Sequence, residues 1–145
     1  MKKLLLAGLC LFSVMTTTGC DAFEKAGNIK DYAGSYVLET AHEKTYHVYW
    51  GSEKLVSERT LFSGVKLIIY ENKSVTYIDN QGKRTYGRIK CLEKYCRFYN
   101  TPLESSYKFY LRNGNSLNYS YESPHMSVEY DVTYRTIVFN RGTVE

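Results

Sequence analysis

Residue types that could do chemistry are present in this sequence, but they are not spaced as a known catalytic or metal centre requires. His42 and His47 in "HEKTYH" are five positions apart, whereas the zinc-protease motif needs two histidines four apart on one helical face. Glu129 and Asp131 lie two apart on a predicted strand, which is typical of a solvent-facing pair. The sequence contains no Gly-x-Ser-x-Gly elbow, phosphate-binding glycine loop or dinucleotide fingerprint. We therefore expect a protein that is not an enzyme and has no catalytic residues, cofactor or metal.

The cysteine with the clearest chemical role is Cys20. Two lysines precede an apolar stretch from Leu4 to Met15, which is the layout of a secretory signal and is too short to span a bilayer as a helix. The following "MTTTGCD" resembles the lipobox of bacterial lipoproteins, although Thr17 stands where that family usually has Leu. This resemblance implies cleavage after Gly19 and acylation of Cys20. The alternative is ordinary signal-peptidase cleavage near Gly19, which would leave Cys20 as a free thiol.

The lipobox resemblance also predicts where the protein works. It implies a bacterial cell-envelope protein that is held to the membrane by acylated Cys20 and faces the periplasm. Asp21 directly after the cysteine resembles the enterobacterial signal for retention at the inner membrane, so that location is expected in such a host. Removal of residues 1–19 takes away two lysines, which leaves 17 basic and 15 acidic residues, a net charge of +2. Neither this charge nor the compartment favours nucleic acid as a partner.

Cys91 and Cys96 remain as an even pair in an oxidising compartment, for which a disulfide is the expected state. They could instead supply two metal ligands, but a closed zinc site needs four, and the histidines lie at unrelated spacings. If the two cysteines face each other across a hairpin, Ile89 must face Phe98 in the next pair. The four residues then share one apolar side, as a half-buried pair of strands requires.

The pattern along the chain divides it into three parts. Residues 1–19 form the signal, residues 20–33 a lipid-anchored tether with one helical turn, and residues 34–145 a single folded domain. From Gly34 onward, short period-2 segments rich in Tyr, Val, Ile, Phe and Thr alternate with turn residues. The predicted strands are 35–40, 45–50, 54–62, 65–71, 74–79, 84–91, 96–100, 106–112, 116–122 and 127–140. Beyond Arg135 the apolar residues of the last strand change phase, which indicates a bulge or bend.

Short connections favour antiparallel neighbours, and closure of the sheet removes its exposed edges. We therefore expect an all-β fold, a single antiparallel meander barrel of about 8–10 strands.

The segment "SYKFYLRNGNSLNYSYE" predicts one hairpin of this barrel in detail. A three-residue loop from Asn113 to Asn115 makes cross-strand pairs on one face, namely Leu111 with Leu117, Phe109 with Tyr119 and Tyr107 with Tyr121. A two-residue Asn-Gly loop would instead set Leu111 against Ser116. The apolar pattern therefore favours the three-residue loop.

Two segments at the ends of the strand region are similar to the small lipocalin-like barrels. They are "AGSYVLE" and "VFNRG", in which a glycine and an aromatic residue on the first strand pack under an arginine from the last. The matching positions are Gly34, Tyr36 and Arg141, with the guanidinium over the ring. Tyr36 stands where lipocalins usually have Trp, and no helix pattern follows the last strand. The resemblance implies a barrel whose interior is filled or holds one small ligand.

The predicted hairpin around the cysteines has a second face that is basic and rich in tyrosine. It consists of Arg84, Tyr86, Arg88, Lys90, Arg97 and Tyr99. Like charges that face each other, as Lys90 and Arg97 would, cost stability unless an anion compensates them. This face could bind lipid head groups, anionic glycans or an acidic protein, or it could be an ordinary solvent-exposed face with Tyr99 over Arg88.

Two classes of binding protein fit these observations. In the first, the barrel lumen takes a small hydrophobic or amphipathic ligand, for which the 15 tyrosines offer apolar bodies and polar tips. In the second, the protein is an inhibitor or immunity factor that binds an envelope-acting hydrolase or toxin through the basic, tyrosine-rich face. The sequence favours the first class through its barrel pattern, and a filled interior would favour the second.

Overall fold

The computed structural model describes residues 25–125 and 127–144. The predicted signal and the predicted lipidation site at Cys20 lie outside these residues. One helical turn, α2 (Ile29–Tyr32), precedes the strands, and the side chain of Asn28 caps it by accepting a hydrogen bond from the backbone N–H of Lys30. Within the described part of the chain, no helix has the length and apolar character needed to cross a membrane.

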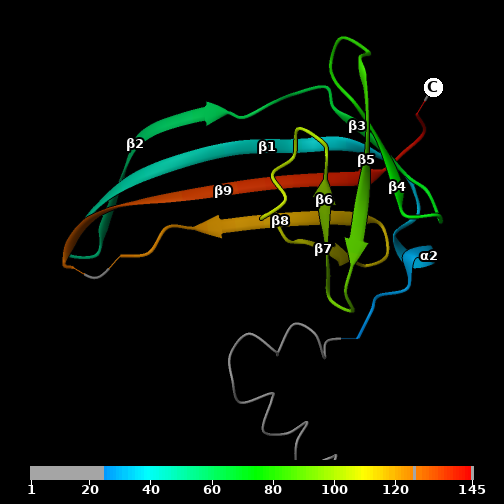
Figure 1. Cartoon of the computed structure of the whole chain (residues 1–145). Coiled ribbons are helices and arrows are strands. Elements are labelled where there is room, and N and C mark those ends of the chain that lie inside the picture. The colour runs from blue at the N-terminus through cyan, green and yellow to red at the C-terminus, as the bar shows by residue number, and fades with distance from the viewer. Residues whose placement is uncertain (1–24, 126, 145) are drawn as a thin grey trace, which may run out of the picture.

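Nine antiparallel strands follow α2 and confirm the all-β prediction (Figure 1). They are β1 (Gly34–Tyr49), β2 (Ser52–Thr60), β3 (Lys66–Ile69), β4 (Ser74–Ile78), β5 (Arg84–Cys91), β6 (Tyr95–Tyr99), β7 (Phe109–Arg112), β8 (Ser116–Glu122) and β9 (Glu129–Arg141). The sheet order β1-β3-β4-β5-β6-β7-β8-β9 closes through β1–β9 pairing into an eight-stranded barrel. β2 is an additional strand that pairs with β1 alone.

β1 is longer than the sequence predicted, because it joins the predicted strands 35–40 and 45–50 into one. A register shift against β9 falls between Leu38 and Thr40, so Glu39 is an extra residue in β1. The shift changes the inward-facing positions from even numbers such as Tyr36 to odd numbers such as Ala41, both of which are buried. β9 itself pairs with β8 without interruption, so the bulge that was predicted in the last strand lies in its neighbour.

Side chains fill the barrel interior. The inner faces of the barrel strands contribute to one apolar core, whose largest fully buried members are Tyr36, Leu67, Ile69, Phe98, Phe109, Leu117, Ile137 and Phe139. The ring of Phe109 lies 5.2 Å from that of Phe98 and 6.1 Å from that of Phe139, measured between centroids. An eight-stranded barrel is narrow enough for side chains alone to fill it, and aromatic side chains do so here.

The β5–β6 hairpin confirms the register that the cysteines predicted. Ile89 pairs with Phe98, and Cys91 pairs with Cys96, to which it is joined by a disulfide. Ile89, Phe98 and Cys96 are buried, so the apolar side of the hairpin faces the core. Its other side therefore faces outward.

The β7–β8 hairpin confirms the three-residue loop and corrects one predicted pair. Leu111 pairs with Leu117, and the ring centroids of Phe109 and Tyr119 are 5.9 Å apart. β7 begins only at Phe109, however, so Tyr107 precedes the strand and does not face Tyr121. Its ring instead stacks on that of Tyr119, with centroids 4.1 Å apart.

Three strands continue beyond the barrel as an arm. The arm consists of residues 42–49 of β1, which pair with β2 on one edge and with residues 129–136 of β9 on the other. Figure 1 shows it leaving the barrel on the side away from α2. All nine residues of β2 are exposed, and its outer edge has no partner strand among the described residues.

Candidate functional site

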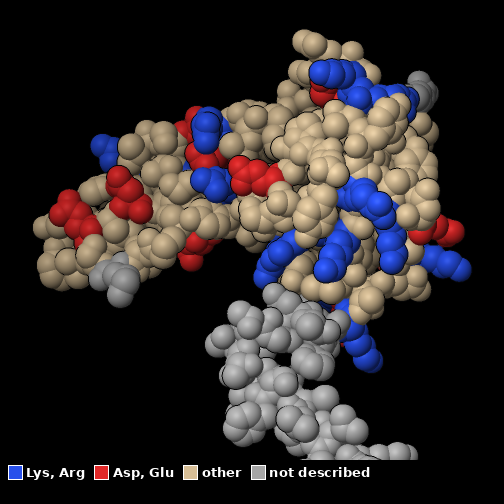
Figure 2. Space-filling view, viewed as in Figure 1, with Lys and Arg blue, Asp and Glu red and all other residues tan. Residues whose placement is uncertain are grey.

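The six residues of the predicted binding face lie together on the outside of the barrel. We call Arg84, Tyr86, Arg88, Lys90, Arg97 and Tyr99 the basic hairpin face. Arg88 pairs with Tyr99 and Lys90 with Arg97, and the β5 members of the face are all exposed. Figure 2 shows Lys and Arg side chains gathered over this part of the barrel, whereas Asp and Glu side chains predominate toward the end of the arm.

The cations of the basic hairpin face have no carboxylate partner within 4 Å among the residues that the structure describes. Arg97 lies with its Cζ 5.6 Å from the ring centroid of Tyr95, and its buried Nε has no hydrogen-bond acceptor. The Nζ of Lys108 approaches the same ring to 4.8 Å. The positive charge of this face is therefore available to an external anion.

A hollow of about 700 Å³ opens beside this face. Its cationic lining comes from Lys73, Arg88 and Lys90, with Tyr99 beside them, and no carboxylate contributes to it. A smaller hollow of about 80 Å³ continues from it and shares Lys90 and Tyr99. The basic hairpin face therefore offers a concave surface with positive charge, which suits a phosphate or carboxylate group.

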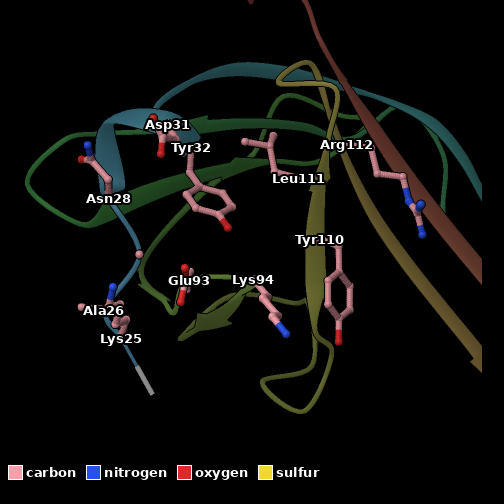
Figure 3. Close-up of a pocket in the computed structure, with 11 residues that line it drawn as sticks. Lys25, Ala26, Asn28, Asp31, Tyr32, Glu93, Lys94, Tyr110, Leu111 and Arg112 are labelled. Carbon is pink, nitrogen blue, oxygen red and sulfur yellow. The ribbon is translucent and has the colours of Figure 1, made fainter. Parts of the chain in front are cut away.

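A second hollow, of about 580 Å³, lies on the other side of residues 25–28 (Figure 3). Tyr32 points into it from α2 and Tyr110 from β7, and Glu93 and Lys94 enter it from the β5–β6 turn. Its lining carries both charges, because Asp31 and Glu93 accompany Lys25, Lys94 and Arg112. This mixed lining is less selective for an anion than the first hollow.

The segment between the two hollows is held against the β5–β6 hairpin. Ala26 forms a β-bridge with Leu92, and the backbone N–H of Gly27 donates to the carbonyl of Cys91 over 3.0 Å. The backbone N–H of Glu93 donates to the carbonyl of Lys25 over 2.9 Å. An added Cβ at Gly27 would come within 2.2 Å of the Leu92 carbonyl oxygen, so only glycine allows this approach. The chain therefore enters the fold at the turn of the basic hairpin.

The arm is the exposed feature that sequence reasoning missed. Cross-strand pairing places Tyr46, Leu55, Tyr130 and Tyr134 on one face of it, which we call the aromatic face. Val48 and Val132 are buried beneath these side chains, and the rings of Tyr46 and Tyr134 meet edge to face at 5.9 Å. The other face continues the inner side of the barrel wall and is polar.

On the polar face, Glu43 lies between two arginines and accepts hydrogen bonds from the Nε atoms of Arg59 and Arg135. These hydrogen bonds lower the pKa of the Glu43 carboxyl below its usual range, and the bond from Arg59 has the largest effect. The three residues belong to β1, β2 and β9, so one carboxylate ties the three strands of the arm together.

His47 occupies a similar position nearer the tip. Its Nδ1 lies 2.8 Å from Asp131 Oδ1 and its Nε2 lies 3.2 Å from Glu129 Oε1. The hydrogen bond with Asp131 is the main cause of a raised His47 pKa. His42 lies on the opposite face and contacts Thr40 Oγ1 through its Nδ1 at 2.9 Å, so the two histidines do not act together. Within the described ranges, no group of three or more His, Cys, Asp or Glu side chains is suited to hold a metal ion.

The tip of the arm is a two-residue turn formed by Trp50 and Gly51. Both have positive φ angles, 49° and 77°, as a type I′ hairpin turn requires. A bulky residue rarely adopts this conformation. The Trp50 side chain is nevertheless 71% exposed, and Tyr49 and Val128 beside it are 52% and 62% exposed. The turn therefore holds a bulky residue in a conformation that costs free energy, with its ring in solvent. The lone tryptophan followed by glycine was the sequence signal that could have indicated this site.

No family model, curated protein or solved structure matched this chain in the comparisons made.

Proposed function

We propose that this protein is a non-catalytic bacterial envelope lipoprotein, anchored through acylated Cys20, that binds a protein partner through its arm. The observation that carries this proposal is the filled barrel interior, since it moves the binding surface from the lumen to the outside of the molecule. The inhibitor or immunity class is therefore favoured over the carrier of a small hydrophobic ligand.

The interior argues against a carrier because its volume is taken up by the protein's own aromatic rings. Phe98, Phe109 and Phe139 are completely buried, and the ring of Phe109 packs against both of the others. A ligand in the lumen would have to displace these side chains, and removing one large aromatic side chain from a core costs about 3–5 kcal/mol. The hollows that we describe lie outside the barrel wall instead.

The arm has the composition of a protein-binding surface. Trp and Tyr dominate the residues that contribute most to protein interfaces, and the tip presents Tyr49 and Trp50 to solvent. Three carboxylates, Glu53, Glu129 and Asp131, accompany Lys54 and His47 at this end of the arm, and the last two carboxylates already contact the His47 ring. The partner that fits the tip is therefore a protein with an apolar pocket bordered by basic side chains, as the cleft of an envelope-acting hydrolase or toxin could offer.

The proposal can be tested with the acylated protein in the envelope of its own host. Amine-reactive cross-linking followed by mass spectrometry should join Lys54 to a partner protein. The Trp50→Ala variant should lose most of these cross-links. The matched control is Tyr70→Ala, which removes an exposed aromatic side chain (42%) between β3 and β4, outside both the arm and the basic hairpin face, and should leave them unchanged.

Two results would contradict this function. One is a set of cross-links that Trp50→Ala and Tyr70→Ala reduce equally, because the arm would then have no special role. The other is a bound mass of a few hundred daltons in native mass spectrometry of the gently recovered protein, which would support the carrier instead.

A further inference from the structure

We infer that the basic hairpin face, together with Lys25 and Lys94 beside it, binds the anionic head groups of the membrane to which the protein is anchored. The barrel would then lie with its β5–β6 hairpin against the bilayer and its arm free for the partner. This inference rests on the proposed acylation of Cys20, and it adds an orientation that the anchor alone does not impose.

The chain enters the fold at the β5–β6 turn, which brings this turn close to the predicted lipid anchor. The hydrogen bonds of residues 25–27 with Cys91 and Glu93 fix the start of the described chain at the hairpin turn. Five residue steps separate Lys25 from Cys20. A chain extends at most about 3.6 Å per residue, so the lipid anchor lies within about 18 Å of the hairpin turn. The chain therefore holds the hairpin turn close to the membrane.

This end of the barrel carries an excess of positive charge. Between Arg88 and Arg97 the sequence carries four cations and one carboxylate, Glu93. None of these cations forms an ion pair with another described residue. Each Lys or Arg near an anionic bilayer contributes about 1 kcal/mol, and the attraction acts over about 8 Å at physiological salt. The short chain from the anchor brings these cations near that range.

The surface beside the basic hairpin face is also hollow. The hollow lined by Lys73, Arg88 and Lys90 has space for a head-group phosphate, with Ile29 and Leu92 forming an apolar part of its wall. Like charges at Lys90 and Arg97 face each other directly across the hairpin. A phosphate between them would remove the repulsion that this pairing otherwise costs.

Lysine footprinting of the acylated protein tests the inference. The protein is placed in nanodiscs of phosphatidylcholine alone, or of phosphatidylcholine and phosphatidylglycerol at about 3:1. Each is then treated briefly with an acetylating reagent, and the modification of each lysine is measured by mass spectrometry. A surface potential of about −30 mV reduces the fraction of neutral amine about threefold, so Lys25, Lys90 and Lys94 should react about three times more slowly in the anionic discs. Lys44 and Lys54, which both lie on the arm, are the internal references.

Matched variants separate binding by charge from mere closeness. Lys90→Gln/Lys94→Gln should weaken the protection of Lys25 in anionic discs, whereas Lys44→Gln/Lys54→Gln, which removes the same charge from the arm, should not. Added salt should abolish the protection.

Equal reactivity of all lysines in both kinds of disc would overturn the inference, and so would protection that does not depend on phosphatidylglycerol. Failure of the proposed anchor is a different result, because the N-terminal peptide would then lack acyl chains and the protein would not enter the discs.

Discussion

Arg141 lies over the ring of Tyr36, with its Cζ 5.0 Å from the ring centroid, and the two residues pair across the seam where β9 meets β1. The guanidinium also donates hydrogen bonds to the carbonyls of Asp31, Ala33 and Gly114. The Tyr36 hydroxyl donates to the Tyr32 carbonyl over 2.7 Å, and burial raises the pKa of Tyr36 to about 12 despite the nearby guanidinium. This pair therefore joins the barrel seam, α2 and the β7–β8 turn.

The first prediction concerns this closure. Arg141→Lys keeps the charge but removes the planar set of donors that reaches three carbonyls, so it should lower the free energy of unfolding by about 1–3 kcal/mol. Denaturant unfolding measures the change. Arg112→Lys, at the exposed last residue of β7, is the matched control and should alter stability little. Equal stability of the two variants would mean that Arg141 is not a structural link.

Gly34 also belongs to this closure, although its role is steric. Its φ is 139°, and a Cβ built there would come within 2.5 Å of Arg141 Nη1. The sequence resemblance predicted the positions of Gly34, Tyr36 and Arg141, and the contacts at the seam agree with it. The resemblance could be used because these residues lie at the two ends of the strand region, where pairing of the first and last strands is what closes a barrel.

The second prediction concerns Glu43. Because its folded-state pKa is lowered, the stability it contributes is present above the usual pKa of a carboxyl and is lost as the pH falls through the lowered value. Glu43→Gln should reduce the free energy of unfolding at neutral pH by about 1–3 kcal/mol, and should make stability less sensitive to acid. Unfolding curves at neutral pH and at about pH 3 measure both effects.

Glu58→Gln is the control for Glu43, since Glu58 pairs with Lys44 at 3.7 Å in an exposed position. It should change stability by less than about 1 kcal/mol. A larger loss of stability from Glu58→Gln than from Glu43→Gln would refute the role of Glu43 in linking the three strands of the arm.

The third prediction concerns His47. Its pKa is raised chiefly by the hydrogen bond with Asp131, so the bond strengthens the arm below the unfolded-state pKa and its effect is lost as the pH rises through the folded-state pKa. An NMR titration should place the His47 pKa above 6.5, the ordinary value. Asp131→Asn should bring it down by more than Glu129→Gln does. A titration unaffected by either variant would show that the ring does not hold these carboxylates in solution.

The fourth prediction concerns the disulfide. Thiol labelling of the denatured, unreduced protein should find Cys91 and Cys96 blocked. The paired change Cys91→Ser/Cys96→Ser should lower the free energy of unfolding by about 2 kcal/mol, because the closed loop is short. Reduction of the unaltered protein should lower the free energy of unfolding by a similar amount. Labelling of both thiols would show that the disulfide is not formed.

The sequence allowed the register of β5 and β6 to be predicted because two cysteines fix the pairing and the alternation of Ile89 and Phe98 fixes the faces. It did not allow the arm to be predicted. Tyr46 and Val48 alternate with polar residues just as barrel residues do, and nothing local distinguishes a strand that leaves the barrel from one that stays in it. The bulge at Glu39 also kept β1 from being predicted as one strand. Alternation of apolar and polar residues identifies a strand only as long as its phase is unchanged, and the bulge shifts that phase. The basic hairpin face was found because alternation alone separates its charges from the core.

The last prediction links stability and binding at Trp50. A type I′ turn prefers Asn before Gly, because Asn tolerates a positive φ better than a bulky residue does. Trp50→Asn should therefore raise the free energy of unfolding by about 1 kcal/mol, even though the edge contact with Tyr49, 6.1 Å between ring centroids, is lost. The same change should abolish most arm cross-links to the partner, as Trp50→Ala does, because the apolar anchor is gone. Denaturant unfolding and cross-linking of the same variant measure the two effects. A variant that gains stability and loses the partner would show that Trp50 serves binding and lowers the stability of the turn. A variant that is less stable and still binds the partner would refute that role.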